Sequence, residues 1–211
     1  MNKMIRKPNN WDSVQVFSDR PKLPLGAYIC TIKKAVIQNN GYGDQLCILF
    51  DISAGEFAGY YADDYKANQR EDKKWRGVLR QFLPKDDGSD KDEWTKSSLK
   101  GLITSIENSN RGYVWNWDET TLAGKEVGIV FRNEEWEYNG KTGWAVRPFR
   151  ATSVSSIDDC TYILPKDKPL KDKNTDSFGG YTSPVSTSGN QYSAPASDFS
   201  ALEDDDSQFP F

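Results

Sequence analysis

Aromatic and basic side chains are interleaved along much of the chain, and this is the pattern with the clearest chemical use. Single-stranded nucleic acid is bound by rings that stack on bases, at about 1–3 kcal/mol per base, and by Lys or Arg side chains that contact phosphates. Seven Trp and ten Tyr supply rings in an otherwise polar chain. We therefore predict a nucleic-acid-binding surface. Its candidate residues are Lys33, Tyr42, Tyr60, Tyr61, Tyr65, Lys73, Lys74, Arg76, Arg111, Tyr113, Trp115, Trp117, Arg132, Trp136, Trp144 and Arg147.

Each ring also has an alternative place in a hydrophobic core. Trp75 lies on an apolar stripe with helical spacing, which favours the core. Tyr113, Trp115 and Trp117 alternate strictly, so we expect them on one face of a strand. Three large rings on one face are either an aromatic edge of the core or a stacking platform, and the pattern leaves both open.

Paired carboxylates offer a second chemistry. Asp63-Asp64, Asp86-Asp87, Glu134-Glu135 and Asp158-Asp159 supply the hard oxygen ligands that Mg²⁺ prefers in a nuclease. Adjacent residues on a strand point to opposite faces, however, and the chain contains no His, the commonest general base and metal ligand. We expect no catalytic residue, metal site or cofactor. A carboxylate-metal nuclease or resolvase is kept as an alternative function, and a protein-only adaptor is another.

The C-terminal region differs in composition from the rest. Residues 174–211 contain six acidic and no basic side chains, whereas residues 1–165 are neutral overall. Pro, Ser, Thr, Gly and Asn dominate after residue 165, and such a segment buries too little apolar surface to offset its chain entropy. We expect a disordered tail that ends in a ligand for a partner protein. Its predicted binding residues are Asp204, Asp205, Asp206, Phe209, Pro210 and Phe211.

The elements that must position these residues follow from periodicity. We predict strands over 26–38, 45–53, 125–138 and 143–154, and a further strand over 56–65. Asn139-Gly140 between the last two is the strongest hairpin signal. Apolar residues at helical spacing predict helices over 71–83 and 95–107.

The predicted fold class is mainly β with a helical insert: an OB-fold-like, five-stranded Greek-key barrel followed by the tail. A flat α+β sandwich is the structural alternative. We divide the chain into an N-terminal arm (1–22), an OB-like domain (23–162), a flexible linker (163–200) and an acidic tip (201–211).

The remaining composition sets limits on partners and location. No stretch approaches 18 consecutive apolar residues, so we expect no membrane partner. The N-terminus lacks the apolar segment of a secretory signal. Cys30, Cys47 and Cys160 are scattered, which is typical of a reducing cytoplasm rather than of disulfides or a zinc site.

Two parts of the chain resemble known families. The tip, with Asp204–Asp206, Pro210 and Phe211, resembles the end of bacterial single-stranded-DNA-binding proteins, which recruits replication, repair and recombination proteins. Phe209 departs from that pattern, in which an aliphatic residue is usual. The resemblance implies the same kind of partner for this tip.

The body looks like the phage-encoded single-strand-binding proteins of Gram-positive hosts. The similar stretches are 100–117, 124–128 and 134–138, within a likeness over roughly residues 20–155. This resemblance implies an OB-fold body that coats and protects single-stranded DNA in the cytoplasm of a bacterial host. Monomer and homo-oligomer are both open, because no interface is legible in the sequence.

Overall fold

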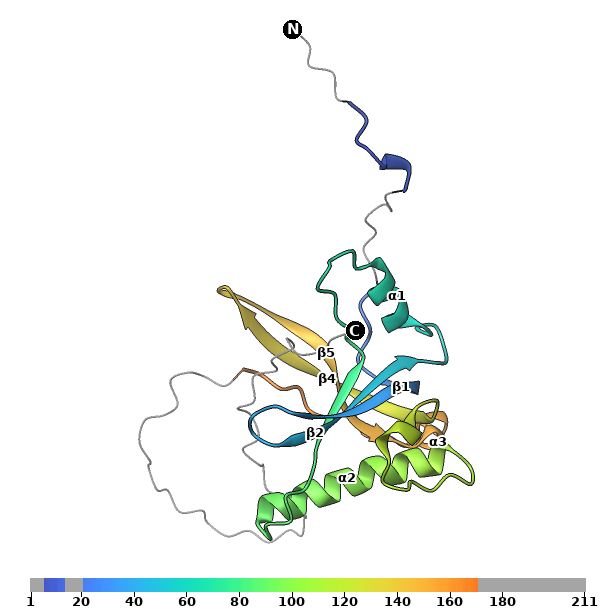
Figure 1. Ribbon diagram of the computed structural model, residues 1–211, viewed down its shortest axis with the longest axis vertical. Helices are drawn as coiled ribbons and strands as arrows, with labels where there is room; N and C mark the ends of the chain where they lie inside the picture. Colours follow the sequence, from blue (N-terminus) through green and yellow to red (C-terminus); the bar gives the residue numbers. More distant parts are fainter. Residues whose placement is uncertain (1–5, 14–20, 171–211) are drawn as a thin grey trace, which may run out of the picture.

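The computed structural model describes residues 6–13 and 21–170. Within these residues the fold is mainly β, with one sheet of five antiparallel strands in the order β3-β2-β1-β4-β5 (Figure 1). The strands are β1 (Ala27–Asn39), β2 (Asp44–Ile52), β3 (Val78–Phe82), β4 (Glu126–Tyr138) and β5 (Lys141–Thr152). The helices are α1 (Tyr60–Ala67), α2 (Asp90–Ser109) and α3 (Val154–Asp158), with short 3-10 turns η1 (Trp11–Ser13) and η2 (Glu119–Leu122).

The four strands predicted from alternation are confirmed. β1 is long enough to pair with β4 over residues 27–31 and with β2 over residues 30–39, and a register shift between Ile32 and Lys34 bends it between the two partners. The β4–β5 turn has Asn139 at φ 50° and Gly140 at φ 72°. Two positive φ values match the turn whose twist suits a two-residue hairpin, which is why Asn-Gly was informative.

The helix predicted over 71–83 is wrong. Residues 78–82 form strand β3, which pairs with β2, and the residues before it form a loop. Val78 and Leu79 are both buried, although successive residues of a strand point to opposite faces. Because both faces are covered here, the strand loses its alternation, and the spacing of its apolar residues resembles that of a helix.

Two other expected strands are also absent from the described residues. The strand predicted over 56–65 is largely replaced by α1, which begins at Tyr60 after Gly59 in the left-handed region. Residues 113–117 form a loop between α2 and η2, in which Trp117 has φ 68°. The alternating rings in this segment do not lie on a strand. The prediction that Tyr113, Trp115 and Trp117 share one strand face is therefore wrong.

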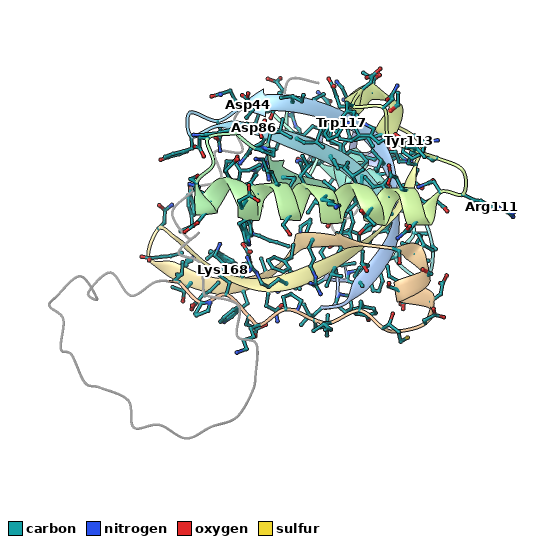
Figure 2. All side chains as sticks on the ribbon, turned by 90° about the horizontal axis from the view of Figure 1, so that it is seen from below. Asp44, Asp86, Arg111, Tyr113, Trp117 and Lys168 are labelled. Atoms are coloured by element: carbon teal, nitrogen blue, oxygen red, sulfur yellow. The ribbon has the colours of Figure 1, made fainter. Side chains whose placement is uncertain are left out.

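The core lies between the sheet and α2. Seen from below, α2 crosses between a layer containing β1 and β2 and a layer containing β4 and β5 (Figure 2). Its apolar stripe, Leu99, Leu102 and Ile106, is buried in the main core, as its spacing predicted. The rings of Phe50 and Phe131 meet edge to face within this core, at 6.2 Å between centroids.

The two edge strands, β3 and β5, approach each other, and both contact α2. Among the described residues they share no backbone pairing, so the sheet is open. Beyond β5, the start of the predicted linker lies against the domain: Lys168 N–H donates to Asn133 O and Glu135 N–H donates to Lys168 O, both at 2.9 Å. Residues after 170 lie outside the described part of the chain.

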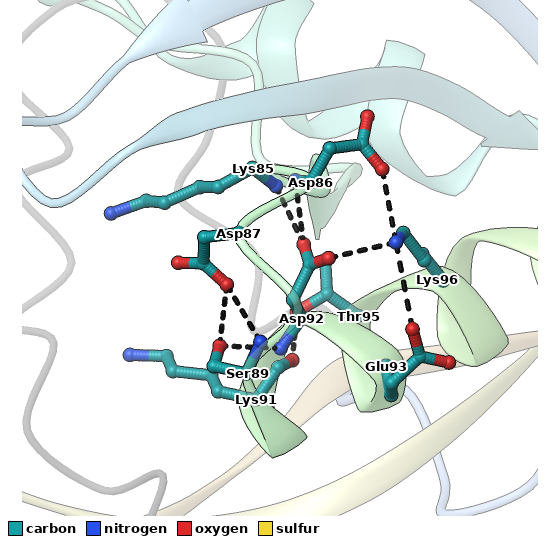
Figure 3. A network of polar contacts seen from close by, with 9 residues as sticks. All are labelled: Lys85, Asp86, Asp87, Ser89, Lys91, Asp92, Glu93, Thr95 and Lys96. Atoms are coloured by element: carbon teal, nitrogen blue, oxygen red, sulfur yellow. Dashed lines mark hydrogen bonds and ion pairs between the residues drawn. The ribbon is translucent and has the colours of Figure 1, made fainter.

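The start of α2 is fixed by a buried carboxylate (Figure 3). The side chain of Asp92 is 1% exposed, and its Oδ2 lies 2.9 Å from Lys96 Nζ. Its Oδ1 accepts the backbone N–H groups of Lys85 and Asp86 at 2.7 and 3.0 Å. The bond from Lys96 and then those two N–H groups lower the pKa of Asp92 against the opposing effect of burial. The carboxylate thereby ties the β3–α2 loop to the helix.

We expect Asp92→Asn to destabilise the protein at pH 7. Because the folded pKa lies below the unfolded value of about 3.9, the ionised carboxylate stabilises the fold at neutral pH, and this contribution is lost as the pH falls through the folded pKa. Denaturant midpoints of the two proteins should therefore converge as the pH falls through the folded pKa of Asp92. Asp90→Asn, at an exposed position of the same helical turn, is the control. A gap that persists unchanged at low pH would contradict this account.

Gly77 marks the tightest approach between β2, the α1 region and the start of β3. A Cβ at this position would lie 2.7 Å from Tyr61 Cδ2 and would also clash with the Phe50 carbonyl oxygen. Phe50 N–H donates to Gly77 O at 2.8 Å, so the backbone is held in place.

We predict that Gly77→Ala lowers the free energy of unfolding by about 1–3 kcal/mol, the usual cost of overpacking. Gly101→Ala is the matched control, because an added Cβ at Gly101 meets no atom within 4 Å. Denaturant unfolding measures both. Equal stability of Gly77→Ala and the wild-type protein would show that the contact is not tight.

Candidate nucleic-acid interface

The sheet has a second face, turned away from the main core, which we call the outer face. Cross-strand partners share a face, and three rows of partners cross β1, β2 and β3 on this side. The rows are Lys34–Leu49–Val78, Val36–Cys47–Arg80 and Gln38–Gln45–Phe82. These rows contain two cations and no carboxylate, and their centre is apolar.

The centre of the outer face is covered by Trp75. Cys47, Leu49 and Val78 form a small apolar cluster separate from the main core, and Trp75 and Val36 pack against it. Trp75 Nε1–H donates to Phe50 O at 3.0 Å, which fixes the indole over the edge of the sheet. Burial raises the pKa of the Cys47 thiol, and the nearby Arg80 opposes that shift.

Beside Trp75 lies a second ring with a cation on it. The rings of Tyr65 and Trp75 are 5.8 Å apart and tilted by 46°. Lys73 Nζ lies 4.4 Å from the centroid of the Tyr65 ring, within the range of a cation–π contact. Together with the outer face, these three residues put aromatic surface and positive charge side by side, as single-stranded nucleic acid requires.

Other predicted residues in this region are placed differently. Lys74 is half-buried in the same loop, and Arg76 Nε lies 3.6 Å from Asp64 Oδ2. Lys33 is exposed on the irregular part of β1, next to the outer face, and Tyr42 is 65% exposed in the β1–β2 turn. Both flank the rows described above.

Tyr60 and Tyr61 belong to the core. Tyr61 is 6% exposed, and its ring meets Phe50 edge to face at 5.4 Å. Tyr60 is half-buried and packs against Tyr61 and Phe57. Burial raises the pKa of the Tyr61 hydroxyl. The sequence left open whether each ring lies in the core or at the surface. Tyr60 and Tyr61 lie in the core, so we leave them out of the interface.

The β4–β5 hairpin carries four predicted residues on two faces. Arg132 and Arg147 are cross-strand partners on the same face as Trp136, whose ring covers Gly143. Trp144 lies on the opposite face and is 49% exposed. Arg132 is hydrogen-bonded to Glu134 and lies 4.2 Å from the Phe149 ring, so part of its charge is already paired.

The remaining predicted residues lie in the α2–η2 loop, and Figure 2 shows Arg111 at the opposite end of α2 from Asp86. Trp115 and Trp117 have centroids 4.9 Å apart, and Trp117 is 77% exposed. Tyr113 is half-buried, with Lys125 Nζ 4.3 Å from its ring centroid. Arg111 is exposed at the end of the helix. The structure thus divides the predicted residues into a core pair and three surface groups, of which one adjoins the outer face.

Sequence reasoning did not place four residues of the outer face in the interface: Lys34, Gln38, Arg80 and Phe82. The missing information was the partner of β3. Once 78–82 pairs with β2, Arg80 and Phe82 must share a face with Cys47 and Gln45. The basic and aromatic character of 80–82 was visible in the sequence, but a helical interpretation placed it elsewhere.

The paired carboxylates do not come together as a metal site in the part of the chain that the structure describes: no three Asp, Glu or Cys side chains gather as ligands there. Within the same residues, no helix is long and apolar enough to cross a membrane. The predicted partner-binding residues, Asp204 to Phe211, lie outside the described residues.

Comparison of the chain with models of known protein families and with curated proteins found no match.

Thiol reactivity tests whether the outer face is covered as described. We expect one fast-reacting cysteine, the exposed Cys160, because the side chains of Cys30 and Cys47 are 0% and 1% exposed. Titration with a maleimide should label one thiol in the native protein and two more after unfolding. In Cys160→Ser the fast phase should disappear. Fast labelling of Cys47 would show that Trp75 does not cover the face.

Proposed function

We propose that the protein binds single-stranded DNA on the outer face of β1, β2 and β3 and is not an enzyme. The observation that carries the proposal is the Tyr65–Trp75 ring pair, with Lys73 on one ring and the apolar outer face beside the other. Bases stack on such rings irrespective of sequence, while Lys34, Lys73 and Arg80 are placed to contact phosphates.

The finer fold assignment belongs to the same proposal. The sheet has the order β3-β2-β1-β4-β5, a helix lies between β3 and β4, and the two edge strands are close together. These three features suit an OB-like barrel whose edges do not pair. In OB folds the face of strands 2 and 3, together with the β1–β2 and β4–β5 loops, binds oligonucleotides. Those two loops here carry Tyr42 and, near the hairpin turn, Trp136 and Trp144.

The second half of the proposal concerns recruitment. The acidic run Asp204–Asp206 with Phe209 and Phe211 suits a partner that offers a basic, apolar pocket. We propose that replication or recombination proteins of a phage-infected bacterial host are recruited in this way, as the resemblance implies. The support for this half is the sequence itself.

We expect labelled dT oligomers to bind with an affinity that falls steeply as salt rises, because counterions are released from the phosphates. Lys34→Ala should weaken binding and reduce the salt slope by about one. Tyr65→Leu should cost about 1–3 kcal/mol of binding free energy through lost stacking. Fluorescence anisotropy at several salt concentrations measures all three proteins.

Lys100→Ala, at an exposed position on α2, is the charge-matched control and should bind like the wild-type protein. Circular dichroism verifies that Tyr65→Leu remains folded. Equal weakening by Lys34→Ala and Lys100→Ala would contradict the proposed location. Absence of binding at low salt would favour a protein-only adaptor, and Mg²⁺-dependent cleavage of the oligomer would favour a nuclease.

A further inference from the structure

A pocket of about 390 Å³ lies where the two edges of the sheet meet α2. Its walls come from residues 79–81 of β3, 98–105 of α2, 149–152 of β5 and 161–163 after α3. This volume falls within the range of small-molecule sites. The pocket is distinct from the outer face, although Arg80 contributes to both.

The lining is suited to an anion. It contains Arg150 and no carboxylate side chain. Arg150 Nη2 donates to Ile163 O at 2.9 Å, which fixes the guanidinium and leaves its other N–H donors for a ligand. A guanidinium held in this way is pre-organised to bind phosphate.

Two aromatic side chains complete the lining. Phe149 is 38% exposed and Tyr162 is half-buried. Arg132 packs on the Phe149 ring at 4.2 Å and is paired with Glu134. Rings beside cations provide surface for a base next to donors for a phosphate.

Gly101 supplies an independent observation. It lies in the interior of α2, where glycine costs roughly 0.5–1 kcal/mol relative to alanine. No positive φ requires it, and an added Cβ would meet no atom within 4 Å. Its missing side chain leaves open space on the helix side of the pocket, where a ligand would lie.

We propose that this pocket binds a nucleotide, with its phosphate on Arg150 and its base against Phe149 and Tyr162. An inserted peptide strand fits less well, because Cα atoms of β3 and β5 already approach within 8 Å. A strand between them would need twice the usual spacing of 4.7–4.9 Å. The nucleotide is either free or part of a bound strand, and the experiment separates these sources.

The test uses dTMP, thymidine and inorganic phosphate as probes of the full-length protein, with binding followed by NMR of ¹⁵N-labelled amides. We expect dTMP to shift amides of the pocket and to bind more tightly than either fragment. Gly101→Leu fills the pocket and should weaken dTMP binding at least about tenfold, which is about 1.4 kcal/mol. Ser97→Leu, at an exposed neighbouring position outside the pocket, should leave it unchanged.

Arg150→Gln provides a second test that does not depend on filling the pocket, and it should remove the preference for dTMP over thymidine. If Gly101→Leu also weakens binding of a dT oligomer, the pocket holds a nucleotide of the bound strand; if oligomer binding is unchanged, it holds a free nucleotide. No dTMP-induced shifts in the pocket, or equal affinity for dTMP and phosphate, would overturn the proposal. The dTMP titration tests only the pocket. The proposal that DNA binds on the outer face is tested by the oligomer measurements with Lys34→Ala and Tyr65→Leu.

Discussion

The structure depends on one constraint: β2 is buried on both faces. Every residue from Gln45 to Ile52 is buried, so the strand needs a cover on each side. On one side Leu46, Ile48 and Phe50 face the main core beneath α2. On the other, Cys47 and Leu49 require a separate cover, which Trp75 provides, with Val78 beside Leu49 in the sheet. Burying one such side chain contributes about 1.5–3 kcal/mol, so the loop that carries Trp75 is held to the sheet. The outer face therefore comes with an aromatic side chain already fixed over it.

The same constraint explains how far the sequence predicted the fold. β1, β4 and β5 keep enough alternation to be recognised, and the Asn139-Gly140 turn carries its own conformational signal. The apolar stripe over 95–107 predicted helix α2. The helix begins earlier than predicted, at Asp90. β3 was missed because Val78 and Leu79 are buried on opposite faces, which removes the period of two. Whether 78–82 is a strand depends on its partner β2, and periodicity within a short segment contains no information about a partner.

The candidate site was predictable in type but only partly in position. The interleaving of rings and cations indicated a surface for single-stranded nucleic acid, and Tyr65, Lys73 and Lys33 lie in or beside the surface that we propose. Tyr61, by contrast, fills the core next to Gly77, where no side chain could replace the glycine without displacing the ring. Tyr61 and Tyr65 lie four residues apart in the same short segment, so their local sequence does not distinguish the two situations. Only the packing of α1 against β2 distinguishes them, and that packing involves residues far apart in the chain.

The outer face, the α1–β3 loop and the start of α2 form one continuous arrangement around β2 and β3. We propose that single-stranded DNA lies on the outer face of this arrangement. Titration of ¹⁵N-labelled protein with a dT oligomer tests this most directly. The account predicts the largest amide shifts along Lys34–Gln38, Gln45–Leu49 and Val78–Phe82, with smaller shifts on the exposed side of α2. Shifts confined to the α2–η2 loop around Trp117, with the three strands unchanged, would contradict it.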